Sequence, residues 1–98
     1  MRKYELSLAA DRDLDDIYTY TFREFGVLQA DAYFESLQGC LITLGDNPLF
    51  GVDASNLRVG YLRFVHQRHM LYYKKSKPGI RVIRILGPGM SIERAIRK

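Results

Sequence analysis

Hydrophobic residues recur at two different spacings along the chain, and the change of spacing marks its elements. Residues 3–8 (KYELSL) alternate polar and apolar side chains, which predicts a short strand. From there the apolar residues recur at steps of three and four, which predicts a helix over about 9–25. Ser7 is a suitable N-cap for this helix, and Gly26 can adopt the positive φ that ends it. A second stripe of the same spacing predicts another helix, which ends at 45–48 (GDNP).

The second half of the chain changes to the pattern of β-strands. After a loop at 47–60, three runs rich in aromatic and β-branched residues occupy 61–66, 69–74 and 80–86. Their separators have the length of hairpin turns, and the third run is apolar on both faces apart from its arginines, as in an interior strand. A short amphipathic segment from about Ser91 predicts a terminal helix.

The short link between the two predicted helices favours an antiparallel helical hairpin. The apolar stripes of two helices cannot cover each other completely, so we expect the hairpin to lie on the sheet. We therefore predict an α+β fold of the order β-α-α-β-β-β with a short C-terminal helix, in which the helical hairpin packs on a mainly antiparallel sheet. A chain of 98 residues has room for one such core, so we expect a single domain over 1–98.

Composition narrows the setting in which the chain works. Cys40, the only cysteine, cannot form an internal disulfide and lies in an apolar helical stripe, which favours burial and a reducing cytoplasm. No apolar run approaches the roughly 18 residues of a membrane span, and the N-terminal residues turn acidic where a signal peptide needs its hydrophobic stretch. We expect a cytoplasmic protein that does not enter a membrane.

The formal net charge of +4 conceals a strong asymmetry between the two halves of the chain. Residues 1–49 carry four basic and nine acidic side chains, a net charge of −5. Residues 50–98 carry eleven basic and two acidic side chains, a net charge of +9. So basic a half-domain either forms a solvated cationic face or binds an anionic partner, such as nucleic acid, an acidic protein segment or a phosphate-rich substrate.

The side chains that could carry chemistry are few. His66 and His69 flank a predicted turn, but acidic residues are scarce nearby and the cysteine is expected in a helix, so we expect no metal site. Four aspartates between 11 and 16 point in several directions on a helix, and we expect them on its solvated outer face. The chain has no nucleophile elbow, phosphate-binding loop or dinucleotide fingerprint, so we expect neither a catalytic residue nor a cofactor.

The basic half is the most informative feature for function. Its arginines are interleaved with tyrosines, and this combination can stack on RNA bases and clamp phosphates. The same side chains are equally suited to binding an acidic protein segment. The arginines are Arg58, Arg63, Arg68, Arg81, Arg84, Arg94 and Arg97, and the tyrosines are Tyr61, Tyr72 and Tyr73.

Several short motifs, spread over nearly the whole chain, resemble one family in combination. They are Leu14-Asp15-Asp16-Ile17, Phe25-Gly26 with Gln29-Ala30 and Tyr33, Asn47-Pro48, Leu57-Arg58 with Gly60, Arg68-His69, and Val82-Ile83-Arg84-Ile85-Leu86 with Met90. With them the chain resembles the ParE toxins of bacterial type II toxin–antitoxin systems, within the wider ParE/RelE superfamily. Two positions depart from that pattern: the family commonly has tryptophan where Phe25 stands and histidine where this chain has Gly87.

The resemblance implies a toxin that inhibits DNA gyrase by binding and is neutralised by a cognate ParD-like antitoxin with an acidic C-terminal segment. Such a toxin needs no cofactor. The exposed part of the helical hairpin is expected to contact the antitoxin. The candidate residues for binding the antitoxin or the target are Arg58, Arg63, Arg68, His69, Arg84, Met90 and Arg94.

Two other functions stay open at this point. One is a RelE-type ribonuclease that cuts ribosome-bound mRNA with Arg63, Arg68, His69 and Arg84 together with Tyr72 or Tyr73. The Gly87-Pro88-Gly89 break speaks against it, because ribonucleases of that type use a histidine or tyrosine near this point. The other is an inactive homologue kept for complex formation. Arg84 also has a structural alternative, since it lies in an apolar strand and could form a buried ion pair.

Overall fold

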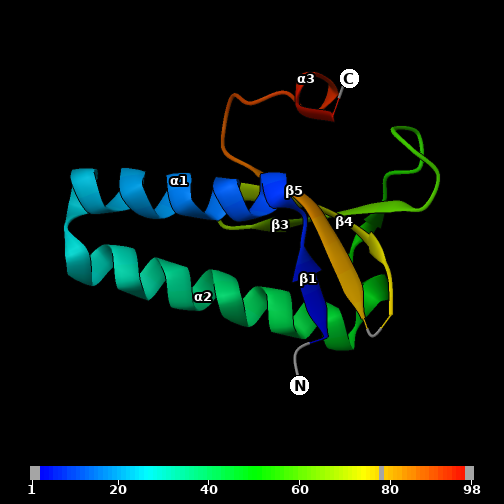
Figure 1. The fold of residues 1–98 in the computed structure, drawn as a ribbon, viewed down its shortest axis with the longest axis horizontal. Helices are drawn as coiled ribbons and strands as arrows, with labels where there is room; N and C mark the ends of the chain where they lie inside the picture. Colours follow the sequence, from blue (N-terminus) through cyan, green and yellow to red (C-terminus); the bar gives the residue numbers. More distant parts are fainter. Residues whose placement is uncertain (1–2, 78, 97–98) are drawn as a thin grey trace.

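The computed structural model describes residues 3–77 and 79–96, and its elements follow the predicted order with one added strand (Figure 1). The expected α+β fold, a helical hairpin on a mainly antiparallel sheet, is confirmed. The elements are β1 (Tyr4–Leu6), α1 (Leu8–Phe25), α2 (Val27–Asp46), the 3-10 turn η1 (Pro48–Phe50), β2 (Val52–Asp53), β3 (Tyr61–His66), β4 (His69–Lys75), β5 (Ile80–Leu86) and α3 (Ile92–Ile96).

The five strands form one sheet in the order β1-β5-β4-β3-β2. β5 is an interior strand, as its two apolar faces predicted, and it pairs with β4 antiparallel and with β1 parallel. The strand β2 lies within the predicted loop 47–60 and pairs with β3 at the other edge. It is only two residues long, which is too short to leave an alternating pattern in the sequence.

The core lies between the helical hairpin and one face of the sheet. Along β4 the side chains alternate between two apolar clusters, because successive residues of a strand point to opposite faces. Leu71 and Tyr73 belong to the main core under the hairpin. Met70 and Tyr72 belong to a smaller cluster on the outer face, which α3 covers through Ile92. Cys40 is half-buried and packs against the main core rather than lying fully inside it.

Both ends of the first helix are set by residues that the sequence identified. The Ser7 hydroxyl accepts a hydrogen bond from the Ala10 amide at 2.9 Å, so Ser7 is the N-cap. Gly26 has a φ of 90° and is the only residue between α1 and α2, which forces the chain to reverse within one residue. The two helices consequently run side by side in opposite directions (Figure 1).

The second helix continues beyond the predicted stop signal. Gly45 was expected to end it, but the helix includes both Gly45 and Asp46. Gly45 is buried because the backbone of Lys3 passes directly over it: a Cβ at this position would come 2.7 Å from the Lys3 carbonyl oxygen. This glycine therefore permits close packing of the N-terminal strand, and the helix end is set by Asn47 and Pro48.

Candidate functional site

A groove lies between the helical hairpin and one end of the sheet, with a volume of about 620 Å³. One wall comes from the two helices, and the other comes from the β3–β4 turn and the segment that follows β5. The residues that line this groove are Asp13, Asp16, Ile17, Tyr20, Thr21, Phe25, Gln29, Tyr33, Gln67, Arg68, His69, Ile85, Gly87, Pro88 and Met90.

The groove exists because the hairpin is longer than the sheet beneath it. Helices of 18 and 20 residues are about 27 and 30 Å long at ~1.5 Å per residue. Strands of six or seven residues reach only about 20 to 23 Å. The end of the hairpin therefore projects beyond the strands, as Figure 1 shows. Apolar side chains at this end stay exposed: Tyr20 at 62%, Phe25 at 63% and Leu28 at 84% of their surface.

Two histidines hydrogen-bond the β3–β4 turn to α2, and one of them, His69, lines the groove. His66 and His69 lie directly opposite each other across the turn. The Tyr33 hydroxyl is hydrogen-bonded to Nδ1 of His69 at 2.6 Å, and the Ser36 hydroxyl is hydrogen-bonded to Nε2 of His66 at 2.9 Å. Burial lowers the pKa of both histidines, and the neighbouring His66 and Arg68 lower that of His69 further. Both imidazoles therefore favour the neutral form at pH 7, and they serve as hydrogen-bonding partners of α2.

Asp13 was expected on the solvated outer face of the first helix, and this expectation is wrong. Only 6% of Asp13 is exposed, and its carboxylate lies against β5 beyond the end of β1. There it accepts hydrogen bonds of 2.8 Å from Nε and Nη2 of Arg84 and from the Ile85 amide. The carboxylate thus occupies the place of a neighbouring strand, which the helix periodicity could not indicate.

Arg84 has the structural role that its apolar strand suggested. Besides its two bonds to Asp13, it donates through Nη1 to the Ala95 carbonyl oxygen at 3.1 Å. The hydrogen bonds to Asp13 raise the pKa of the guanidinium. Arg84 thereby joins α1, β5 and α3, and three of its five N–H groups are engaged within the chain. Its predicted role in binding stays a prediction.

Three of the seven predicted binding residues meet at the groove: Arg68, His69 and Met90. Arg68 is exposed at the β3–β4 turn, next to Gln67, whose φ of 53° lies in the left-handed region. Met90 is 54% exposed, and its sulfur accepts a hydrogen bond from the Gly87 amide at 3.2 Å. This bond holds the Gly87-Pro88-Gly89 break as a compact turn at the rim of the groove.

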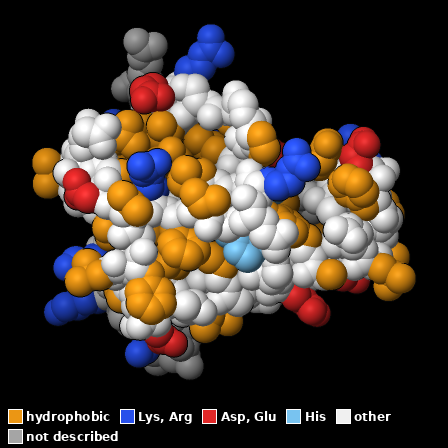
Figure 2. Space-filling model, turned by 180° about the vertical axis from the view of Figure 1, so that it is seen from behind, with side chains coloured by type: hydrophobic (Ala, Val, Ile, Leu, Met, Phe, Trp, Pro, Cys, Tyr) orange, Lys and Arg blue, Asp and Glu red, His pale blue; other side chains and the backbone are white. Residues whose placement is uncertain are grey.

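The other predicted arginines lie away from the groove. Arg63 is exposed on the outer face of β3, and Arg94 is exposed on α3. Arg58 donates a hydrogen bond of 3.4 Å to the Ile96 carbonyl oxygen at the end of α3. Figure 2 shows the reverse side of the molecule, where groups of hydrophobic side chains are separated by lysines and arginines. Among residues 3–77 and 79–96, the exposed arginines of the basic half therefore lie dispersed over separate elements.

From the sequence, the helical wall of the groove was predicted only in general terms, as the exposed part of the helical hairpin. Its members Ile17, Thr21 and Phe25 were assigned to the apolar stripe without regard to position along it, and Tyr20 was not assigned to it. The length of the first helix was the signal that could have located this wall. Its apolar stripe extends farther than a six-residue strand can cover, so part of the stripe has to stay exposed. Tyr33 was part of the family motif, but no local pattern shows that it meets His69.

The described residues hold no metal cluster and no membrane helix. Within residues 3–77 and 79–96, no group of three or more histidine, cysteine, aspartate or glutamate side chains could bind a metal ion. Over the same residues, no helix is both long and apolar enough to span a membrane.

Comparison with known families decides the identity of the chain. Residues 4–91 match the family model described as "ParE toxin of type II toxin-antitoxin system, parDE". The chain belongs to the ParE toxin family. The match begins at the first residue of β1 and ends at Ser91, one residue before α3, so every wall of the groove lies within it. The resemblance carried by the sequence motifs is thereby confirmed.

Individual relatives agree with this membership. The chain is 39% identical over 93 residues to "Toxin ParE1" of Caulobacter vibrioides, covering 93% of this chain and 94% of that protein. It is 33% identical over 93 residues to "Toxin ParE1" of Mycobacterium tuberculosis, covering 94% of this chain and 95% of that protein. A solved structure titled "Chromosomal ParDE TA system from P. aeruginosa" has the same fold, with a TM-score of 0.74 at 17% identity over 89% of this chain and 96% of that one.

The position that departs from the ParE family pattern, Gly87, has room for a side chain. A Cβ there would lie 3.6 Å from His69 Nε2 and 3.8 Å from the Met90 sulfur, which are ordinary van der Waals distances. The absent histidine is therefore not excluded by the backbone. In this ParE-family member, the imidazole of His69 on β4 lies next to the space that a side chain at Gly87 would occupy.

Proposed function

We propose that this chain acts by binding: it inhibits DNA gyrase and is held inactive by an antitoxin of the ParD type. The proposal rests on membership of the ParE toxin family and on the expectations that the sequence motifs carried. It requires no cofactor, and it sets the action of the chain in the cytoplasm, where gyrase works on DNA.

One observation favours binding over mRNA cleavage: the side chains that a ribonuclease would use are separated or engaged. A general acid or base has to reach the reacting group within hydrogen-bond distance. Arg84 is held by Asp13, and the buried Tyr73 donates its hydroxyl to the Pro48 carbonyl oxygen at 2.7 Å. Tyr72 is only 8% exposed and packs beneath α3, on the face of the sheet opposite to Tyr73.

The groove supports an antitoxin as the partner. Its helical wall presents the apolar Ile17, Tyr20 and Phe25 beside the polar Asp16 and Gln29, and its other rim carries Arg68. An amphipathic segment matches both sides if its apolar face lies on the helices and its acidic residues face Arg68. A segment that is disordered alone and folds on binding can follow such an extended surface. The solved P. aeruginosa structure of the same fold is titled a ParDE system, which is the pairing that we propose here.

A supercoiling assay tests the gyrase proposal. Purified chain in molar excess should abolish the negative supercoiling of relaxed plasmid by gyrase, and prior addition of the cognate antitoxin should restore it. Undiminished supercoiling at every excess of the chain contradicts the proposal. Ribosome-bound mRNA incubated with the same preparation provides the second arm, because site-specific cleavage there would instead identify a ribonuclease.

A third function, an inactive homologue kept for complex formation, makes a separate prediction. Expression without antitoxin should then leave growth unaffected, while the gyrase proposal expects growth arrest with intact mRNA. The Gly87-Pro88-Gly89 turn is the feature that would account for inactivity. Restoring the family histidine with Gly87→His distinguishes the cases, since only an inactive homologue should gain toxicity.

A further inference from the structure

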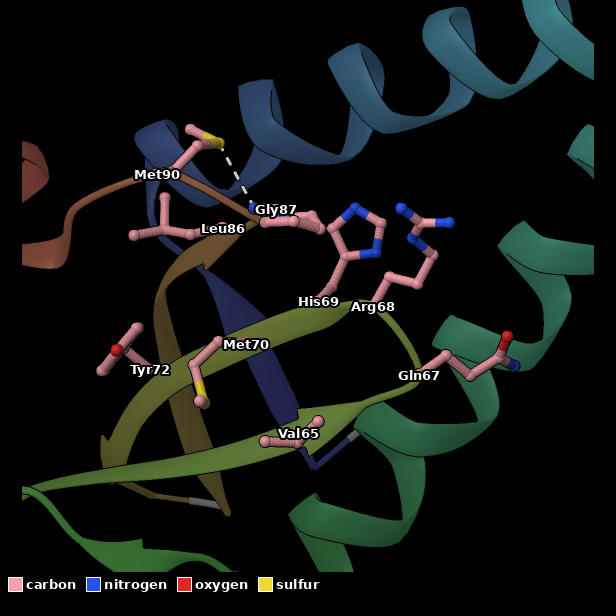
Figure 3. Close-up of a pocket in the computed structure, with 10 residues that line it drawn as sticks. Val65, Gln67, Arg68, His69, Met70, Tyr72, Leu86, Gly87 and Met90 are labelled. Carbon is pink, nitrogen blue, oxygen red and sulfur yellow. Dashed lines mark hydrogen bonds between the residues drawn. The ribbon is translucent and has the colours of Figure 1, made fainter.

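A second, smaller hollow lies on the outer face of the sheet, just across a ridge from the groove (Figure 3). We call it the notch. Its volume is about 280 Å³. Its apolar walls are Val65, Met70, Tyr72, Leu86, Pro88 and Met90. The β3–β4 turn and the segment 87–90 form the ridge, and residues of both line the notch and the groove alike.

The notch is an apolar surface that α3 leaves uncovered. Ile92 of α3 packs on Tyr72 and Leu86, which closes one side of this face. Beyond it, Val65 remains 58% exposed and Met90 remains 54% exposed. Figure 3 shows the side chains of Val65, Met70 and Tyr72 standing on adjacent strands, with Leu86, Gly87 and Met90 above them. Such a patch beside a second, larger hollow is typical of an interaction surface.

The size of the notch indicates what kind of group it takes. Sites for small molecules and cofactors span roughly 300–1,000 Å³, so a hollow of 280 Å³ falls just below that range. It suits one large side chain from a partner, the way anchor residues fill pockets in protein interfaces. Met70 and Met90 make the walls adaptable, because thioether side chains fit branched and aromatic groups alike.

The charge at the notch indicates what flanks that side chain. Its lining includes Arg68 and His69 but no aspartate or glutamate. Arg68 is exposed and has no ion pair within residues 3–77 and 79–96. In Figure 3 its guanidinium stands at the edge of the notch, on the ridge toward the helices. A carboxylate placed beside the apolar anchor would meet this guanidinium.

We propose that the notch is an anchoring subsite for one large apolar side chain on an acidic peptide segment of the partner, with a neighbouring carboxylate bound by Arg68. This inference rests on the proposed antitoxin, whose acidic segment would leave the groove, cross the ridge and insert the anchor on the outer face. The antitoxin would then contact both faces of the sheet, the groove on the hairpin side and the notch on the outer side.

Charge insertion in the notch tests this subsite. Val65→Glu places a carboxylate among its apolar walls, and Arg68→Glu reverses the charge on the ridge. Each should weaken binding of the cognate antitoxin to the full chain by at least about tenfold, measured by calorimetry. Val59→Glu is the matched control for the first, since Val59 is 94% exposed and lies outside both hollows. Lys75→Glu is the control for the second, since Lys75 is exposed, lies outside both hollows and is not a candidate binding residue. Both controls should change the affinity less than twofold.

The outcomes separate this inference from the gyrase proposal. Unchanged antitoxin affinity in Val65→Glu and Arg68→Glu, with melting curves that match the wild-type chain, overturns the subsite. Loss of gyrase inhibition by Val65→Glu with antitoxin binding intact also overturns it, because the notch would then face gyrase. Self-association that Val65→Glu abolishes would assign the notch to a second copy of the chain and overturn it likewise. A wild-type chain that leaves gyrase active removes the gyrase proposal alone, since the antitoxin measurement does not depend on it.

Discussion

Asp13 shows how one buried side chain can set the arrangement of three elements. Its carboxylate satisfies an amide of β5 and two donors of Arg84, and Arg84 in turn binds a carbonyl of α3. A buried ion pair of this kind contributes little relative to an apolar replacement of both partners, but removing one partner is costly because the other charge stays desolvated. Asp13 therefore secures position and register more than it adds net stability.

Asp13→Ala should lower the free energy of unfolding by about 3 kcal/mol, because Arg84 and the Ile85 amide lose their acceptor. For a domain of this size that corresponds to a fall in melting temperature of at least ~10 °C. Asp15→Ala, an exposed aspartate on the same helix, is the matched control and should change stability by less than about 0.5 kcal/mol. Calorimetric or circular-dichroism melting measures both, and equal stability of the two variants would contradict the role given to Asp13.

At the scale of elements, the β3–β4 turn is the part that links the groove to the notch. Its position depends on His66 and His69, which bond to Ser36 and Tyr33 of α2. Both histidines have a lowered pKa in the folded chain, from an ordinary value of 6.5. A lowered pKa means that the folded state resists protonation. The contribution to stability is complete above pH 6.5 and is lost as the pH falls through the lowered values.

The chain should consequently become less stable between pH 7 and pH 5, and the loss should be smaller in a variant without these imidazoles. The double substitution His66→Asn and His69→Asn tests this, with melting temperatures recorded at several pH values. The wild-type curve should fall more steeply than that of the variant across the interval. Parallel curves would show that the two histidines do not titrate differently in the folded and unfolded chain.

At the scale of the whole molecule, the unequal charge of the two halves is only partly neutralised by folding. Among the described residues, Arg81 pairs with Glu5 and Arg84 pairs with Asp13, which joins the basic half to the acidic half. Arg58 and Arg63 have no such ion pair in the described part of the chain, and both are exposed. These exposed cations give the surface a positive long-range field, which suits the acidic antitoxin segment that we propose as the partner.

The association rate with the antitoxin should fall by about tenfold or more when ionic strength is raised from ~50 to ~500 mM, because salt screens this field. Combined Arg58→Glu and Arg63→Glu should lower the rate at low salt and flatten its salt dependence. Arg23→Glu, in the acidic half of the chain, is the control and should leave the rate nearly unchanged. Stopped-flow kinetics measures all three, and a rate indifferent to salt would exclude electrostatic steering.

Local pattern was enough to predict the helices and the longer strands of this chain, but not the two-residue strand β2. Periodicity located both long helices, the three long strands and the terminal helix, and Ser7 and Gly26 set the ends of the first helix as predicted. The family motifs carried the identity, since residues 4–91 match the ParE toxin family. The predictions for Asp13 and Gly45 were wrong because a segment distant in the sequence packs against each of these residues. Gly45 was taken as a stop signal because only the folded chain brings Lys3 across it.

The sequence by itself determined what each segment becomes, because hydrophobic spacing, caps and turns act over a few residues. It also determined the charge of each half, on which the proposal of an acidic partner rests. Only the tertiary structure decided which side chains meet: Asp13 with Arg84, Tyr33 with His69, and the walls of the groove with those of the notch. The physical reason is that these contacts join residues up to 71 positions apart, so they depend on how the hairpin lies on the sheet and no local pattern encodes them.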